Sequence, residues 1–353
     1  MYILESYPLA VAFCVLTMFC WGSWANTQKL AGKTWRFELF YWDYVLGVFI
    51  LSALFALTVG STGEFGRGFL ADLQQASPTA IGSAFAGGVV FNLANILLVA
   101  AIAIAGMSVA FPVGIGLALV LGVLLNYAAN PAASGNPILL FVGVGLITIA
   151  IIINALAYGR LPKDESAVSG GAKGLILSVL CGVLMSLFYY FVARSLAGVQ
   201  VPSVEELQSV TVDNLKNGTL EAGKMTAYSA NFIFALGILL SNFVINTAIQ
   251  LKPFVGTPIS PLAYFKGAFR DHFWGIIGGC IWGVGMSANI VAANVASPAV
   301  AYGLGQGATI VSAIWGVFIW REFRNAKQGT GLMLAVMFTL FIVGLTLLIV
   351  TKL

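Results

Sequence analysis

Charged side chains are scarce in this chain of 353 residues. Asp, Glu, Lys and Arg together make up 8% of it, whereas a soluble domain carries about 25%. Hydrophobic residues account for 59%. So little charge cannot cover a surface that faces water on all sides, which excludes an ordinary soluble domain. We expect an integral, multi-pass membrane protein, made of helices only, for which lipid is the main solvent.

Histidine and cysteine are nearly absent as well. The single histidine, His272, has no second histidine with which to form a metal site or a catalytic triad. The four cysteines lie in apolar runs without CxxC spacing, so we expect neither a disulfide nor a metal site. No basic run with interleaved aromatic residues is present, which argues against a nucleic-acid partner. The sequence therefore predicts no enzyme, no metal and no cofactor.

A positively charged leader is also missing, because no Lys or Arg precedes the first apolar run. Glu5 stands there instead, which favours a retained first span over a cleaved signal peptide.

Long apolar runs are what the chain does have. A helix that crosses a bilayer needs about 20 mostly apolar residues. Ten segments qualify: 7–28, 37–60, 80–105, 108–129, 137–158, 174–195, 228–250, 272–296, 299–320 and 329–351.

The basic residues predict the orientation. Of the 17 Lys and Arg residues, 12 fall in the loops that follow the odd-numbered spans, and 5 fall on the other side. Cytoplasmic loops carry the excess of Lys and Arg, so both termini should face outward. The long polar segment 197–227 would then be external.

An internal repeat divides the chain into two halves. A shift of 191 residues aligns Gly87-Gly88 with Gly278-Gly279, and Gly114 and Gly116 with Gly305 and Gly307. An odd number of spans per half makes the two copies point opposite ways across the membrane, as in secondary transporters with inverted repeats. We expect a first five-helix repeat over 1–160, a short cytoplasmic linker over 161–173 and a second repeat over 174–353.

Asp43 lies inside the second predicted span. A carboxylate at the centre of a bilayer helix costs about 2.5–3.5 kcal/mol on insertion scales. One interpretation is an interfacial carboxylate paired with Lys33 or Arg36. The other is a group that faces a water-filled path and exchanges a proton, with H⁺ as the expected coupling ion and Na⁺ as the alternative. We take the second interpretation as the working hypothesis.

Amides and aromatic side chains inside the spans form the candidate substrate site. Asn242, Asn246 and Gln250 recur every four residues and share one helix face. Each amide has an alternative role in helix–helix hydrogen bonds, and each aromatic ring in packing. Uncharged donors and acceptors from both repeats suit a small neutral polar solute. The predicted substrate-binding residues are Trp21, Trp24, Asn92, Asn95, Tyr190, Asn246, Asn289 and Gln306.

Several short motifs resemble the ureide permease family. They are "MYILES" at 1–6, "GSW" at 22–24, "LFYWDY" at 39–44, "AGGVVFNLAN" at 86–95, "VLGVLLNY" at 120–127 and "VSAIWGVFIWREFR" at 311–324. The family belongs to the drug/metabolite transporter superfamily, beside glucose/ribose and rhamnose porters. Asn95 and Gln306 match amides of the family pattern. The loop "LPKDESAVSGGAKG" is shorter than the central loop of plant members, which suggests a bacterial relative in the cell membrane.

The resemblance implies transport of ureides such as allantoin or of nucleobases such as uracil, and the sugar-porter relatives add monosaccharides. We expect a proton-coupled importer that works by alternating access. The alternative is a membrane receptor or structural subunit that binds such solutes without transporting them.

Overall fold

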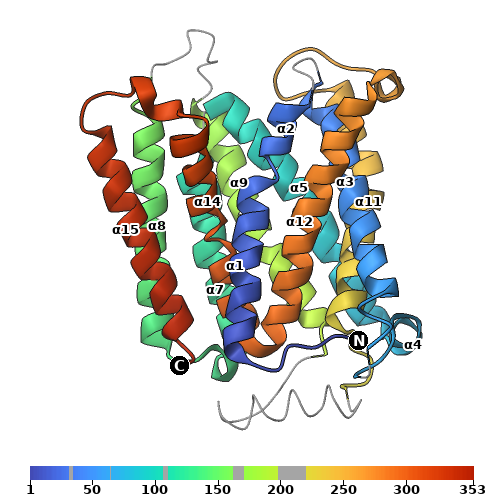
Figure 1. Cartoon of the computed structure of the whole chain (residues 1–353). Helices are drawn as coiled ribbons and strands as arrows, with labels where there is room; N and C mark the ends of the chain where they lie inside the picture. The colour runs from blue at the N-terminus through green and yellow to red at the C-terminus, as the bar shows by residue number, and fades with distance from the viewer. Residues whose placement is uncertain (32–34, 64, 106–109, 162–170, 198–219) are drawn as a thin grey trace.

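The computed structural model describes residues 1–31, 35–63, 65–105, 110–161, 171–197 and 220–353 (Figure 1). Within these ranges the chain is helical, and its one extended pairing is an isolated bridge between Leu196 and Met225. Much of the predicted linker and of the predicted external segment lies outside the described residues. The all-helical membrane fold expected from the composition is confirmed.

Nine helical segments in the described ranges are long and apolar enough to cross a bilayer. They correspond to nine of the ten predicted spans. The segments are α1 (Tyr7–Ser23) continued by α2 (Asn26–Leu30), α3 (Phe37–Leu57), α5 (Pro78–Ala105), α8 (Pro137–Tyr158), α9 (Gly171–Ser195), α11 (Ala227–Leu251), α12 (Phe269–Ala296), the stretch Pro298–Ile319 and α15 (Thr330–Val350).

The remaining predicted span is shorter. It consists of the π-helix η1 (Phe111–Ile115) and α7 (Gly116–Ala129), and its apolar part, Val113–Ala129, sits at the lower limit of about 17–25 residues for a crossing helix. Short elements lie between the long helices: α4 (Phe69–Gln75), η2 (Ala132–Ser134), η3 (Pro261–Lys266) and η5 (Glu322–Asn325).

The bundle has two ends that differ in what they carry. Both chain termini and α4 lie at one end, at the bottom of Figure 1, and α2 lies at the other. We call these the terminal end and the α2 end. The segment with η3 joins α11 to α12 at the α2 end.

Two helix pairs pack with their backbones in contact. A Cβ added at Gly88 of α5 would overlap the Phe234 carbonyl oxygen of α11, and one added at Gly279 of α12 would overlap the Tyr44 carbonyl oxygen of α3. Glycine allows this close approach because it has no side chain. Gly88 and Gly279 are the residues that the 191-residue shift aligns, and their helices run in opposite directions through the bundle (Figure 1).

Candidate functional site

A central cavity of about 320 Å³ lies between helices from both halves of the chain. It extends from the middle of the bundle toward the α2 end. Its lining is uncharged wherever described residues form it, and consists of Trp21, Trp24, Ala25, Gln28, Phe37, Phe91, Asn95, Leu98, Val99, Ile102, Ile115, Met185, Phe188, Trp282, Gln306, Ala308, Thr309 and Ser312.

Helix interruptions surround this cavity. The stretch Pro298–Ile319 divides into α13 (Pro298–Gly305), α14 (Ala308–Ile314) and the π-helix η4 (Trp315–Ile319), with Gln306 at the break. The first span breaks likewise between Ser23 and Asn26, where Trp24 faces the cavity. Broken helices at membrane depth are tolerated where they line a cavity, and transporters place binding sites there.

Stacked aromatic rings form the inner wall of the cavity toward the terminal end. The Trp21 and Trp282 rings stack with centroids 5.7 Å apart and planes 10° apart, and Phe91 lies 4.6 Å from Trp282. Trp21 fits here because Gly285 and Gly305 flank its indole, and a Cβ on either would come within 3.0 Å of the ring. Flat apolar rings of this kind suit a flat solute.

Two amides reach the cavity from opposite halves of the chain. Asn95 of α5 keeps 5% of its surface exposed and donates from Nδ2 to the Tyr41 hydroxyl at 3.2 Å. Gln306 keeps 8% exposed at the break before α14. Of the predicted substrate-binding residues, the structure therefore brings Trp21, Trp24, Asn95 and Gln306 together.

Three polar cavity residues escaped the sequence analysis: Gln28, Thr309 and Ser312. Gln306, Thr309 and Ser312 recur at intervals of three residues, which places them on one helix face. That spacing was a usable signal for Thr309 and Ser312. Gln28 lies in the short helix after the break of the first span, and the apolar run alone does not reveal such a break.

Three other predicted binding residues lie outside the central cavity in this conformation. Asn92 donates to Ser241 Oγ at 2.9 Å, and Asn289 donates to the Ala301 carbonyl at 2.9 Å. Both amides thus make the helix–helix contacts that were their alternative interpretation. Tyr190 is half-buried, and the Arg194 guanidinium lies over its ring at 5.5 Å.

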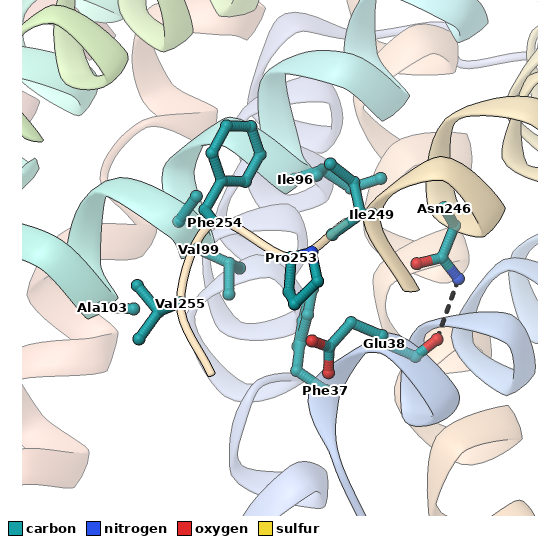
Figure 2. A pocket seen from close by; sticks show the side chains of 11 residues that line it. Phe37, Glu38, Ile96, Val99, Ala103, Asn246, Ile249, Pro253, Phe254 and Val255 are labelled. Carbon is teal, nitrogen blue, oxygen red and sulfur yellow. Dashed lines mark hydrogen bonds between the residues drawn. The ribbon is translucent and has the colours of Figure 1, made fainter. Parts of the chain in front are cut away.

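Asn246 belongs to a separate side pocket of about 150 Å³ between α3, α5 and α11 (Figure 2). Its Nδ2 donates to the Glu38 carbonyl oxygen at 2.9 Å, and Gln250 donates to the same oxygen at 3.1 Å. The pocket is mostly apolar and shares Phe37 and Val99 with the central cavity.

Asp43 does not face the central cavity, contrary to the expectation of a water-filled path. Its side chain is fully buried. The Tyr264 hydroxyl donates to Oδ1 at 2.5 Å, and His272 Nδ1 lies 3.0 Å from Oδ1 and 3.1 Å from Oδ2. These contacts satisfy the carboxylate inside the protein, so it needs no water in this conformation.

The predicted partners of Asp43 bond elsewhere or lie outside the described residues. Arg36 pairs with Glu38 at 2.5 Å, and Lys33 is not among the residues that the structure describes. The observed partners come from the distant segment 264–272. Burial and the Asp43 carboxylate raise the pKa of the Tyr264 phenol above its usual range. The hydroxyl therefore keeps its proton and stays a hydrogen-bond donor.

A second buried carboxylate, Asp72, is held differently. Arg67 Nε donates to its Oδ1 at 2.9 Å, and the Thr226 amide donates to its Oδ2 at 2.7 Å. The bond from Thr226 fastens α4 to the start of α11 at the terminal end, and the ion pair with Arg67 balances the buried charge of Asp72. An arginine stays charged at all working pH values, so the pair suits a structural role, whereas the partner of Asp43 is a histidine.

The profile of the family described as "Ureide permease" matches residues 40–174 and 171–351. The chain belongs to the ureide permease family. It is therefore an integral membrane transporter and not an enzyme, as the sequence analysis predicted.

Curated plant relatives match along the whole chain. Ureide permease 1 of Arabidopsis thaliana is 23% identical over 391 positions, which cover 100% of this chain and 99% of the relative. Ureide permease 2 of the same plant is 24% identical over 100% and 99% of the two chains. Probable ureide permease A3 of Vigna unguiculata is 24% identical over 93% of this chain and 99% of its own.

A solved structure supports the fold. A crystal structure of another protein superimposes on this chain with a TM-score of 0.59 at 14% identity, over 96% of this chain and 95% of the other. Similarity at this identity concerns the arrangement of helices alone.

Proposed function

We propose that the protein is a secondary-active, proton-coupled importer of small neutral polar solutes. The observation that carries the proposal is an uncharged cavity between the two halves of the chain, with amides from both halves and aromatic rings between them. Ureides such as allantoin, which the names of the relatives suggest, lead the substrate candidates. Nucleobases such as uracil and monosaccharides follow, because they also combine a flat or apolar face with neutral hydrogen-bonding groups.

Alternating access fits the shape of the bundle. The cavity reaches from mid-bundle toward the α2 end, and the Trp21–Trp282 stack and the backbone contact of α5 with α11 lie toward the terminal end. Ten crossings in two inverted repeats, over 1–160 and 174–353, are supported by the termini at one end and by the corresponding glycine contacts. We take the α2 end as cytoplasmic because the basic residues gather there.

Asp43 is our candidate for the coupling group. It is a fully buried carboxylate in a crossing helix, and the imidazole of His272 contacts it. In this scheme Asp43 binds a proton on the outer side together with the solute, and releases it on the inner side.

A receptor or structural subunit is the rival function. Such a protein would bind the solute without carrying it across the membrane, and the membership of the permease family favours transport.

Uptake by purified protein in liposomes tests the proposal. Labelled allantoin, uracil and glucose are offered with the lumen alkaline relative to the outside. Wild-type protein should accumulate at least one of them, and collapse of the proton gradient with an uncoupler should abolish the accumulation.

The Asp43→Asn variant isolates the coupling role, because asparagine fills the same volume and exchanges no proton. We expect this variant to lose accumulation against a gradient while exchange of labelled for unlabelled solute persists. Accumulation equal to that of the wild type rejects Asp43 as the coupling group. Binding without any transport by the wild type supports the receptor function instead.

A further inference from the structure

Asp43 has no direct contact with water, which raises the question of how a proton reaches it. Its side chain is fully buried, and a Cβ on Gly275 of the facing α12 would contact it. Tyr264 covers one side and holds its own proton in a hydrogen bond to Oδ1. A group that exchanges protons during a transport cycle needs a route to one side of the membrane at a time.

His272 touches both Asp43 and the water-exposed surface. Its Nδ1 bonds the carboxylate, and its side chain keeps 24% of its surface exposed. Within the described part of the chain, the other ring nitrogen, Nε2, has no hydrogen-bond partner. His272 sits in the first turn of α12 at the α2 end, two residues from the exposed Arg270, so this surface lies at the water interface.

Two residues hold the imidazole in this orientation. Trp35 packs edge to face against it with centroids 5.1 Å apart. Gly267 leaves room beside Nε2, because a Cβ at this position would lie 2.6 Å from that nitrogen. The ring therefore presents one nitrogen to the buried carboxylate and the other to the α2 end.

Other ionisable groups near Asp43 are engaged elsewhere. Glu38 and Arg36 pair with each other at the start of α3. In the first turn of α12, Arg270 donates to the Leu30 carbonyl and Asp271 accepts from the Ala268 amide. Lys266 of η3 is exposed. The side of α11 that meets this part of α3 presents the amides of Asn246 and Gln250.

We propose that His272 is a proton relay between water at the α2 end and the buried carboxylate of Asp43. A proton from water adds to Nε2, and the proton on Nδ1 passes to Asp43 Oδ1, so the imidazole is neutral again as the other tautomer. Release runs in reverse. Because the substrate cavity extends toward the same end, solute and proton have access to the same side in this conformation.

The inference deepens the proposed coupling role of Asp43, yet its test needs no substrate. Infrared difference spectra of the purified protein record the protonated carboxyl band of a buried aspartic acid, and the band missing in Asp43→Asn is the one of Asp43. After a rapid drop in pH this band should grow about 10²-fold more slowly in His272→Gln than in the wild type, at the low end of the effect of a positioned proton-transfer group. Glutamine keeps a hydrogen bond but carries no proton between two nitrogens.

Chemical rescue separates a relay from a structural role. In His272→Ala, added imidazole should restore the rate, whereas pyrazole should not, since that ring has the same size but takes up a proton only in strong acid. Tyr158→Phe is the matched control. It removes another tyrosine–carboxylate bond at the α2 end, from the Tyr158 hydroxyl to Glu322 at 3.2 Å, and should leave the rate unchanged.

The outcomes distinguish the two proposals. Growth of the Asp43 band at the wild-type rate in His272→Gln overturns the relay and leaves the coupling role of Asp43 intact. Equal rescue by pyrazole also overturns the relay, because filling the space would then suffice. If the wild type shows no Asp43 band from mildly acidic to mildly alkaline pH, the relay and the coupling role are both wrong.

Discussion

At the scale of single residues, Gln306 and Asn95 offer the clearest test of the central cavity. They come from opposite halves of the chain and are nearly buried. A solute bound between them loses a hydrogen bond when either is truncated, which leaves a buried polar group unpaired at about 1–3 kcal/mol. We predict that Gln306→Ala and Asn95→Ala each weaken binding by about 5- to 150-fold.

Equilibrium binding on purified variants measures this effect. Asn92→Ala is the matched control, since Asn92 lies one turn from Asn95 on α5 and bonds Ser241 outside the cavity. Its affinity should equal that of the wild type. If both test variants bind the solute with wild-type affinity, the solute binds at another site. If all three variants lose affinity equally, the loss comes from disturbed helix packing.

Lys352, next to the C-terminus, should make the stability of the folded protein depend on pH. Its Nζ donates to the Val295 carbonyl at 2.7 Å, and burial lowers its pKa to about 8. An unfolded lysine titrates near 10.4, so between about pH 8 and 10.4 the unfolded chain binds a proton that the folded chain does not. Stability therefore rises with pH across this window.

Thermal unfolding in detergent, followed across that window, checks the sign. Lys352→Met keeps the side-chain length and removes the charge, so the rise specific to Lys352 should vanish. The difference in melting temperature between variant and wild type should shrink as the pH increases. A difference that is constant with pH shows that Lys352 does not lose its proton in the folded state.

At the scale of helices, glycine determines how closely α5 approaches α11 and α3 approaches α12. We predict that Gly88→Ala and Gly279→Ala each destabilise the protein by about 1–3 kcal/mol, the usual cost of overpacking, because the added methyl group meets a backbone carbonyl that cannot move aside. Gly82→Ala on the same α5 is the control, since nothing lies within 4 Å of its added Cβ.

Melting temperatures of the three variants in one detergent measure this effect. Gly82→Ala should melt at or slightly above the wild-type temperature, because alanine favours helix over glycine. Equal melting of Gly88→Ala and Gly82→Ala contradicts the close backbone contact. The same comparison for Gly279 tests the corresponding contact of α12 with α3.

The sequence predicted most crossing helices because 20-residue apolar runs leave few alternatives in lipid. It did not predict the breaks at Trp24 and Gln306. Apolar residues flank Gln306 on both sides, and the polar residues that follow Trp24 read as the end of the first span. It identified four cavity residues through residue type and depth. It missed His272 as the partner of Asp43 because 229 residues separate them and because the span was predicted to begin at 272, whereas α12 begins at Phe269.

At the scale of the whole molecule, the sidedness of the bundle is the remaining prediction. Cysteines introduced at Gln328 and Gln74, in a background without the four native cysteines, report on the two ends, because both positions are exposed. Gln328 precedes α15 at the α2 end, and Gln74 lies in α4 at the terminal end. The loops that follow the odd-numbered predicted spans carry 12 of the 17 basic residues, and Lys29 of α2 and Lys266 of η3 lie at the α2 end, so that end should be cytoplasmic. An impermeant thiol reagent on intact cells should therefore label Gln74→Cys alone, and permeabilisation should expose Gln328→Cys. If only Gln328→Cys is labelled on intact cells, the α2 end faces outward instead, and the cavity opens to the outside in this conformation.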